Sequence, residues 1–277
     1  MLERFSLESA SSGDKEGETN RPLIELVDIW KSFGPIRALR GVGLDIMPGE
    51  TLALLGDNAA GKSTLMKILT GVYQPDRGEI RVGGQSVVFD RPSKSRELGI
   101  EMIYQDFALS ENLNISANVF LGREIRKGYL GGVIQVLDNG TMERESQRVL
   151  GSLDLQMNPR LKVRRLSGGQ RQAVAIARAL AFDARLIIMD EPTANLAVGK
   201  VEKLLELTKR LHSLGVAVII ITHRLDEAFA VSSRLLIMRQ GEVVGRFASH
   251  ETTESEVAHL ISKGCPEPNP NEGESLT

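Results

Sequence analysis

The sequence has one cysteine, no strong net charge and no long apolar run. Disulfide scaffolds and multi-cysteine zinc or iron–sulfur sites need several cysteines, so the single Cys265 excludes them and is typical of a reducing compartment. Lys and Arg total 34 against 36 Asp and Glu. The chain therefore lacks the strongly basic surface that binds nucleic acid through its phosphates, and we expect no nucleic-acid partner.

Segments that cross or enter a membrane are also missing. The longest apolar run is Val216–Ile221, whereas a membrane-spanning helix needs about 20 residues. Residues 6–20 are polar and acidic and lack the apolar core of a signal peptide. We therefore expect an intracellular chain that does not itself span a membrane.

Hydrophobic residues make up 42% of the chain and charged residues 25%, which are ordinary values for a globular protein. Residues 1–22 are rich in Ser, Glu, Gly and Lys, and residues 264–277 combine prolines with polar residues. Both compositions predict disordered tails. The folded domain is therefore predicted at 23–263.

Short apolar runs alternate with helical patterns inside this domain. Strands are predicted at 23–29, 42–47, 51–55, 100–104, 185–189, 216–222 and 234–238. Helices are predicted at 62–70, 142–153, 170–181 and 200–213. This alternation favours an α/β fold with a mostly parallel sheet. Residues 106–165 break the rhythm and are interpreted as an inserted, mainly helical subdomain.

One glycine-rich loop has the pattern G-x-x-x-x-G-K-[ST]. It consists of Gly56, Asp57, Asn58, Ala59, Ala60, Gly61, Lys62, Ser63 and Thr64. The loop follows a predicted strand and begins a predicted helix, so its backbone N–H groups can point at phosphate oxygens. Lys62 can reach the β- and γ-phosphates, and the Ser63 hydroxyl can bind Mg²⁺. The ordinary alternative is a glycine-rich turn at a helix start.

The predicted strand at 185–189 is followed by two carboxylates, Asp190 and Glu191. In a P-loop enzyme the first acid after such a strand holds Mg²⁺ directly or through water. Glu191 would then lie beside the γ-phosphate, where it could orient and deprotonate the attacking water. Alone, the pair could be a solvated strand end. The phosphate loop upstream is what makes the catalytic interpretation of the pair strong.

A second glycine-rich turn, with the sequence LSGGQ at 166–170, precedes the helix predicted at 170–181. Its polar part consists of Ser167, Gly168, Gly169 and Gln170. Free N–H groups and the helix dipole make such a turn an anion site, although it could also be a simple N-cap. A chain with one nucleotide loop does not need two phosphate sites, so we infer that the second serves the nucleotide of another copy.

These motifs, in this order and spacing, resemble those of the ATP-binding subunit of an ABC transporter, with Walker A at 56–64, the signature at 166–170 and Walker B at 186–191. The resemblance covers nearly all of 23–263. It implies a P-loop NTPase core, an N-terminal antiparallel β subdomain and a helical subdomain at about 106–165. It also implies ATP hydrolysis with Mg²⁺ by a homodimer, bound to an integral-membrane permease at the cytoplasmic face of the inner membrane.

The resemblance assigns roles to further residues. Gln105 matches the Q-loop glutamine, which would touch Mg²⁺ or the attacking water and relay the nucleotide state to the permease. His223 matches the switch histidine that contacts the γ-phosphate, and Phe33 matches the aromatic that stacks on adenine. Trp30 is the competing aromatic and is assigned to packing. Residues 194–196 match the D-loop, which crosses to the opposite protomer.

Two positions depart from the family pattern. Ala59 stands where a glycine is usual, so a positive φ there would cost on the order of 1 kcal/mol. Ala197 stands where the D-loop usually has an aspartate, which weakens the expected coupling between the two ATP sites. Neither departure removes a phosphate or metal ligand.

The segments at 104–109 and 118–124 and the start of the Walker loop are similar to those of bacterial monosaccharide importers of the ribose, xylose and fructose type. This similarity implies a sugar importer in which a solute-binding protein delivers substrate to a separate permease. The alternatives are a soluble ABC ATPase of DNA repair or translation, an exporter ATPase, and a regulatory module without turnover. Glu191 and His223 argue against the last.

Overall fold

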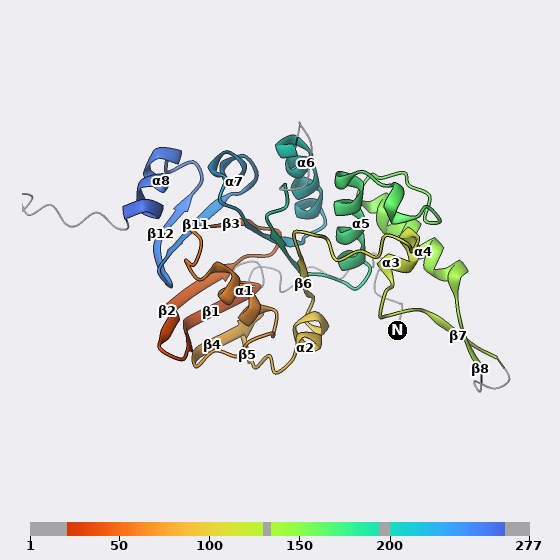
Figure 1. Cartoon of the computed structure of the whole chain (residues 1–277), viewed down its shortest axis with the longest axis horizontal. Helices are drawn as coiled ribbons and strands as arrows, with labels where there is room; N and C mark the ends of the chain where they lie inside the picture. The colour runs from red at the N-terminus through yellow and green to blue at the C-terminus, as the bar shows by residue number, and fades with distance from the viewer. Residues whose placement is uncertain (1–20, 130–133, 194–199, 264–277) are drawn as a thin grey trace, which may run out of the picture.

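The computed structural model describes residues 21–129, 134–193 and 200–263 (Figure 1). Most of the predicted N-terminal tail, the C-terminal tail and the predicted D-loop lie outside these residues. In the described part of the chain, no helix is long and apolar enough to cross a membrane.

The central sheet has six strands in the order β12-β11-β3-β10-β9-β6. Their bounds are β12 Glu242–Ala248, β11 Arg234–Arg239, β3 Thr51–Leu55, β10 Ala217–Ile221, β9 Leu186–Asp190 and β6 Ile100–Ile103. All neighbours are parallel except β12, which runs antiparallel to β11. Strands β3 and β10 are buried along their whole length, as continuous apolar runs in a sheet covered on both faces should be.

A second, antiparallel sheet forms the N-terminal part, in the order β2-β1-β4-β5. Its strands are β1 Ile24–Phe33, β2 Ile36–Ile46, β4 Arg77–Val82 and β5 Gln85–Val87. Helix α1, Lys62–Leu69, buries Leu65, Met66, Ile68 and Leu69 in one apolar cluster with β1, β2 and one face of the central sheet. The helix that begins at the phosphate loop is therefore fixed between the two sheets.

The opposite face of the central sheet is covered by helices. A second apolar cluster joins α3 Ile115–Val119, α4 Asn139–Ser152, α5 Gly168–Leu180 and α6 Lys200–Ser213 to β9 and β10. A third joins α7 Leu225–Val231 and α8 Glu254–Lys263 to β3 and β11. Helix α2, Pro92–Glu97, precedes β6, and a 3-10 turn, Val163–Arg165, precedes the signature.

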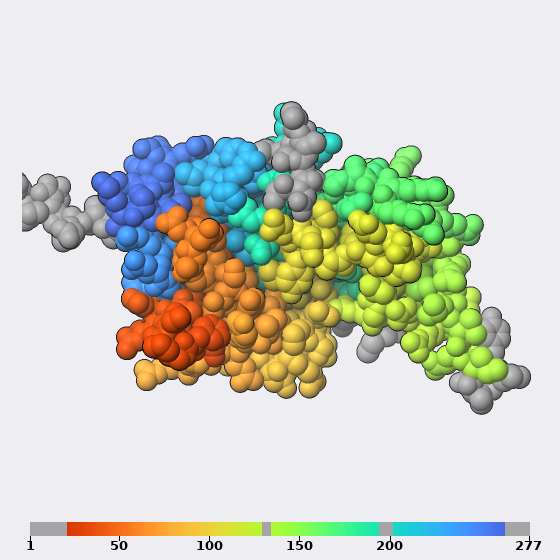
Figure 2. Space-filling model, in the orientation of Figure 1, coloured from red at the N-terminus to blue at the C-terminus, as the bar shows by residue number. Residues whose placement is uncertain are grey.

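The fold class predicted from the sequence is confirmed, and most predicted elements end within a few residues of the observed ones. The first two strands are longer than predicted because they form a hairpin whose turn contains Gly34 at φ 59°. Sequence patterns missed the hairpin of β7, Arg126–Tyr129, and β8, Ile134–Leu137. All of β8 is exposed, so it carries no buried periodicity, and Figure 2 shows this arm standing out from the body.

Candidate functional site

The topology gathers the predicted site residues at one edge of the central sheet. Four adjacent parallel strands, in the order β3-β10-β9-β6, end there. The phosphate loop follows β3, His223 follows β10, Asp190 and Glu191 end or follow β9, and Gln105 follows β6. Ligands of open α/β sheets bind outside the carboxyl ends of the strands, so this edge is the candidate site.

The phosphate loop needs glycine at two positions for steric reasons. Gly56 has φ 145°, and a Cβ there would lie 2.2 Å from the Met238 carbonyl oxygen of β11. Gly61 has φ 102°, and its Cβ would lie 2.8 Å from the Ala38 carbonyl oxygen. Ala59 also has a positive φ, 68°. This is the backbone conformation in which an alanine at this position is expected to be strained.

The N-terminus of α1 is available to an anion. Its N-cap is Gly61, which has no side chain to cap the first turn, and that turn contains no acidic residue. Ser63 is exposed at the start of the helix and Thr64 is half-buried. Exposed N–H groups at a helix start attract phosphate through hydrogen bonds and the helix dipole.

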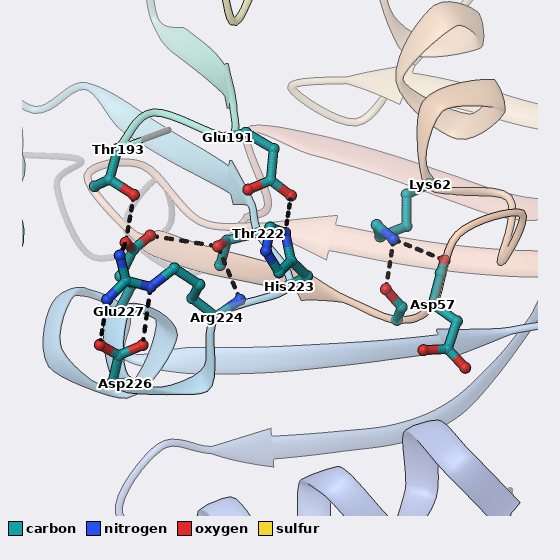
Figure 3. Close-up of polar contacts among 10 residues, drawn as sticks. Asp57, Lys62, Glu191, Thr193, Thr222, His223, Arg224, Asp226 and Glu227 are labelled. Carbon is teal, nitrogen blue, oxygen red and sulfur yellow. Dashed lines mark hydrogen bonds and ion pairs between the residues drawn. The ribbon is translucent and has the colours of Figure 1, made fainter. Parts of the chain in front are cut away.

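Lys62 reaches back over the loop. Its Nζ donates to the carbonyl oxygens of Gly56 at 2.5 Å and Asp57 at 2.9 Å (Figure 3). Burial lowers the pKa of this ammonium, whereas the carboxylates of Glu191, Asp57 and Asp190 act to raise it. Lys62 therefore lies within the electrostatic reach of both Walker B acids.

The two acids after β9 have different surroundings. Burial, and then the charge of Glu191, raise the pKa of Asp190, while Lys62 acts to lower it. Glu191 has φ 47° and its backbone N donates to Ile221 at 2.9 Å. Its carboxylate Oε1 lies 2.8 Å from Nδ1 of His223. The side chain of His223 is 71% exposed, so this contact is its clearest positional restraint.

The signature forms a complete capping box. The Ser167 backbone N donates to Gln170 Oε1 at 2.9 Å, and the Gln170 backbone N donates to Ser167 Oγ at 3.3 Å. The capping role, which the sequence offered as the alternative to an anion site, is therefore present. Within the described residues, no hydrogen bond or ion pair joins residues 167–170 to Lys62, Glu191 or His223, so one copy does not link its two glycine-rich turns.

The two candidate aromatic side chains, Phe33 and Trp30, differ in their contacts. Phe33 is 41% exposed and packs edge-to-face on Tyr73 with ring centroids 5.2 Å apart. Trp30 is held by its Nε1, which donates to Asp28 Oδ1 at 2.8 Å. Phe33 therefore keeps part of its ring exposed, with Lys31 Nζ 5.7 Å from the ring centroid. Gln105 is exposed in the turn after β6.

Sequence reasoning missed a polar cluster beside this site, whose members are buried except for Arg224. It contains Thr193, Thr222, Arg224 and Glu227. The sequence shows a glutamate in the first turn of the helix after His223. This alone does not predict a buried cluster, because the helix dipole favours an exposed glutamate at the same position. Only its burial distinguishes it.

Comparisons with known proteins identify the family. The ABC transporter family profile matches residues 39–194. The xylose/arabinose import ATP-binding protein of Sulfolobus acidocaldarius is 44% identical over 87% of this chain and 94% of its own length. The fructose import ATP-binding protein of Rhizobium meliloti is 43% identical over 79% of this chain and 86% of its own. A ribose import ATP-binding protein of Rubrobacter xylanophilus is 43% identical over 87% of this chain, which spans 47% of that relative.

Solved structures give the same result. A nucleotide-free ATP-binding cassette from an ABC transporter superposes with TM-score 0.72 at 25% identity, covering 87% of this chain and 95% of that one. A dimeric bacterial ABC transporter cassette gives 0.66 at 27% identity, covering 82% and 98%. With the motif order and fold, these matches show that the chain belongs to the ABC transporter family, of which it is an ATP-hydrolysing subunit.

Proposed function

We propose that this chain hydrolyses ATP as a homodimer and thereby powers the import of a monosaccharide through a separate membrane permease. The observation that carries the chemistry is the 2.8 Å contact between Glu191 and His223 on neighbouring strands beside the phosphate loop. The sugar class is supported by relatives whose names specify xylose/arabinose, fructose and ribose import.

In this proposal the nucleotide is held by the phosphate loop, the start of α1 and the antiparallel sheet. The loop from Gly56 to Thr64 and the start of α1 bind the phosphates, with Lys62 at the β- and γ-phosphates. The open ring of Phe33 stacks on adenine, as its exposure and its support by Tyr73 allow. Glu191 orients and deprotonates the attacking water, and His223 contacts the γ-phosphate.

The donor set also fits Mg²⁺. This ion prefers oxygen ligands and is usually held by one or two protein groups together with substrate phosphates. The exposed Ser63 hydroxyl, the Asp190 carboxylate and the Gln105 side chain lie at the carboxyl edge of the sheet. When bound, Mg²⁺ neutralises charge that develops on the phosphates.

A second copy completes the site in this proposal. The signature turn, Ser167 to Gln170, begins α5 and makes no hydrogen bond or ion pair with the phosphate loop of its own copy in the described structure. Two copies packed head to tail would place each signature on the partner's ATP. One of the structural relatives is a dimeric ABC transporter cassette, which supports the formation of a dimer.

The remaining partners follow from the importer assignment. The permease would contact the chain near Gln105 and would receive its sugar from a periplasmic or extracellular solute-binding protein. The ATPase would then work at the cytoplasmic face of the membrane, without a nucleic-acid partner.

The test is purification of tagged Glu191→Gln protein with ATP and Mg²⁺ from detergent-solubilised host membranes. Recovery of a multi-span permease is expected, and stimulation of wild-type ATP hydrolysis by a sugar-loaded binding protein in proteoliposomes would identify the substrate. Recovery of soluble partners alone, with ATP-dependent dimerisation intact, would overturn the importer proposal.

A further inference from the structure

We propose that Glu227 is a positioning residue for ATP hydrolysis, because its buried carboxylate connects the segment after Glu191 to the loop that carries His223. The inference rests on the proposed roles of Glu191 and His223. It concerns a residue that touches neither the phosphate loop nor the predicted signature in the described structure.

Glu227 lies in the first turn of α7, and its side chain is completely buried. A buried carboxylate must be compensated by hydrogen bonds and charge, because desolvation strongly disfavours it. Leu225 and Ala228, its neighbours on α7, pack in the apolar cluster with β3 and β11. An apolar side chain at position 227 could pack beside these residues and would need no hydrogen bonds or opposite charge. The presence of a buried carboxylate with its own set of partners therefore calls for an explanation.

Three side chains supply that compensation (Figure 3). The hydroxyl of Thr193 donates to Oε1 of Glu227, and the hydroxyl of Thr222 donates to Oε2 at 3.3 Å. The guanidinium of Arg224 lies 2.8 Å from Oε1. Thr193 and Thr222 are themselves buried, whereas the Arg224 side chain is 41% exposed, so the polar cluster runs from the protein interior to its surface.

The positions of these partners in the chain give the cluster its significance. Thr193 lies two residues after Glu191, and Thr222 and Arg224 lie directly before and after His223. The Thr222 hydroxyl also accepts a hydrogen bond from the Arg224 backbone N at 3.1 Å. One carboxylate therefore restrains the backbone on both sides of His223 and on the far side of Glu191.

The Glu191–His223 contact depends on this restraint because little else holds the histidine. Its ring is mostly exposed, whereas the backbone around it is tied to Glu227. Displacements of about 1 Å in a catalytic constellation can cost on the order of a hundredfold in rate. Loss of the Glu227 network should therefore lower kcat for ATP and leave nucleotide binding nearly unchanged.

The same arginine provides a matched control. Arg224 also pairs with Asp226 at 2.7 Å, but Asp226 is 56% exposed and contacts neither Thr193 nor Thr222 in the described structure. Asp226→Asn removes one ion pair from Arg224 and weakens the hydrogen bond that the Asp226 carboxylate accepts from the Glu227 backbone N–H, but it leaves the three side-chain partners of the Glu227 carboxylate in place. Its kcat should stay within about twofold of the wild-type value, since exposed ion pairs contribute little.

The experiment measures kcat and KM for ATP, and the thermal midpoint, in the full-length dimeric protein. Glu227→Gln is expected to lower kcat about tenfold or more with KM within about twofold. Thr193→Val should lower kcat in the same direction, and Thr193→Ser, which keeps the hydroxyl, should restore it. The double variant Glu227→Gln/Thr193→Val should lose less than the product of the single losses, because the two residues share one interaction.

The outcomes separate this inference from the function on which it rests. Wild-type kcat in both Glu227→Gln and Thr193→Val would overturn the inference, as would equal losses in Thr193→Val and Thr193→Ser. A lower thermal midpoint with unchanged kcat would show a structural role only. If Glu191→Gln retained full hydrolysis, the assignment of Glu191 would fail whatever the Glu227 variants did. The Thr193 variants keep the inference testable if Glu227→Gln does not fold.

Discussion

The strain at Ala59 predicts that replacing it by glycine stabilises the protein. Ala59 has φ 68° in the phosphate loop and is exposed. The left-handed region costs a non-glycine residue about 1–2 kcal/mol, whereas a glycine costs about 0.4–1 kcal/mol because it adds freedom to the unfolded chain. Ala59→Gly should therefore raise the free energy of unfolding by about 0.5–1 kcal/mol.

The adjacent alanine gives the opposite expectation. Ala60 is buried, has no positive φ, and packs with α1 and β2 in the first apolar cluster. Ala60→Gly adds the same freedom to the unfolded chain and removes a buried methyl group, so it should lower the free energy of unfolding by about 1 kcal/mol or more. The two variants share one loop and one chemical change, and they differ in φ and burial.

The assay is urea denaturation followed by circular dichroism, with the thermal midpoint as a second readout. A change of 1 kcal/mol shifts the midpoint by roughly 2–4 °C in a domain of this size. Ala59→Gly should move it up and Ala60→Gly should move it down. If Ala59→Gly were destabilised as much as Ala60→Gly, the backbone at position 59 would not be strained and the reasoning would be refuted.

Three further predictions concern the site. Glu191→Gln should lower kcat about a hundredfold or more and keep ATP binding, measured by phosphate release and by titration with a fluorescent ATP analogue; hydrolysis near the wild-type rate would contradict its role as base. The raised pKa of Asp190 means that this carboxylate binds a proton more tightly in the folded state than in the unfolded state. The free energy of unfolding therefore falls as the pH rises from the unfolded-state pKa of Asp190 to its folded-state pKa. Asp190→Asn should therefore unfold at higher urea than wild type at pH 7, with little advantage at pH 3, while losing Mg²⁺-dependent hydrolysis. Phe33→Ala should weaken ATP binding about tenfold. Trp30→Phe, which removes the bond to Asp28 and part of the indole ring but keeps an aromatic side chain, should not; equal losses would contradict the adenine assignment.

Much of the site could be predicted because its motifs are local. The phosphate loop, the signature and the acids after β9 each occupy a few consecutive residues, and each lies between an apolar run and a helical pattern that the chain itself displays. Hydrogen bonding within a loop or a first helical turn needs no distant partner. The capping box of Ser167 and Gln170 is of this kind.

The contacts between strands required the tertiary structure. Glu191 and His223 meet because β9 and β10 are adjacent and parallel, with Asp190 paired to Ile221. Neither apolar run specifies which strand lies beside it, since a strand buried on both faces can pack in any interior position of a sheet. The exposed hairpin of β7 and β8 escaped prediction for the opposite reason, because it buries nothing that would impose a pattern.

The sequence by itself determined the family motifs, the α/β alternation and the residues available for phosphate binding, because these depend on short-range spacing and on which runs can be buried. Tertiary structure alone decided the order of the strands, the positive φ of Ala59 and the burial of Glu227. A glutamate after a switch histidine looks like a solvated helix start in sequence. It becomes part of a buried network only when β9 and β10 bring Thr193 and Thr222 to the same carboxylate, which is a consequence of long-range packing.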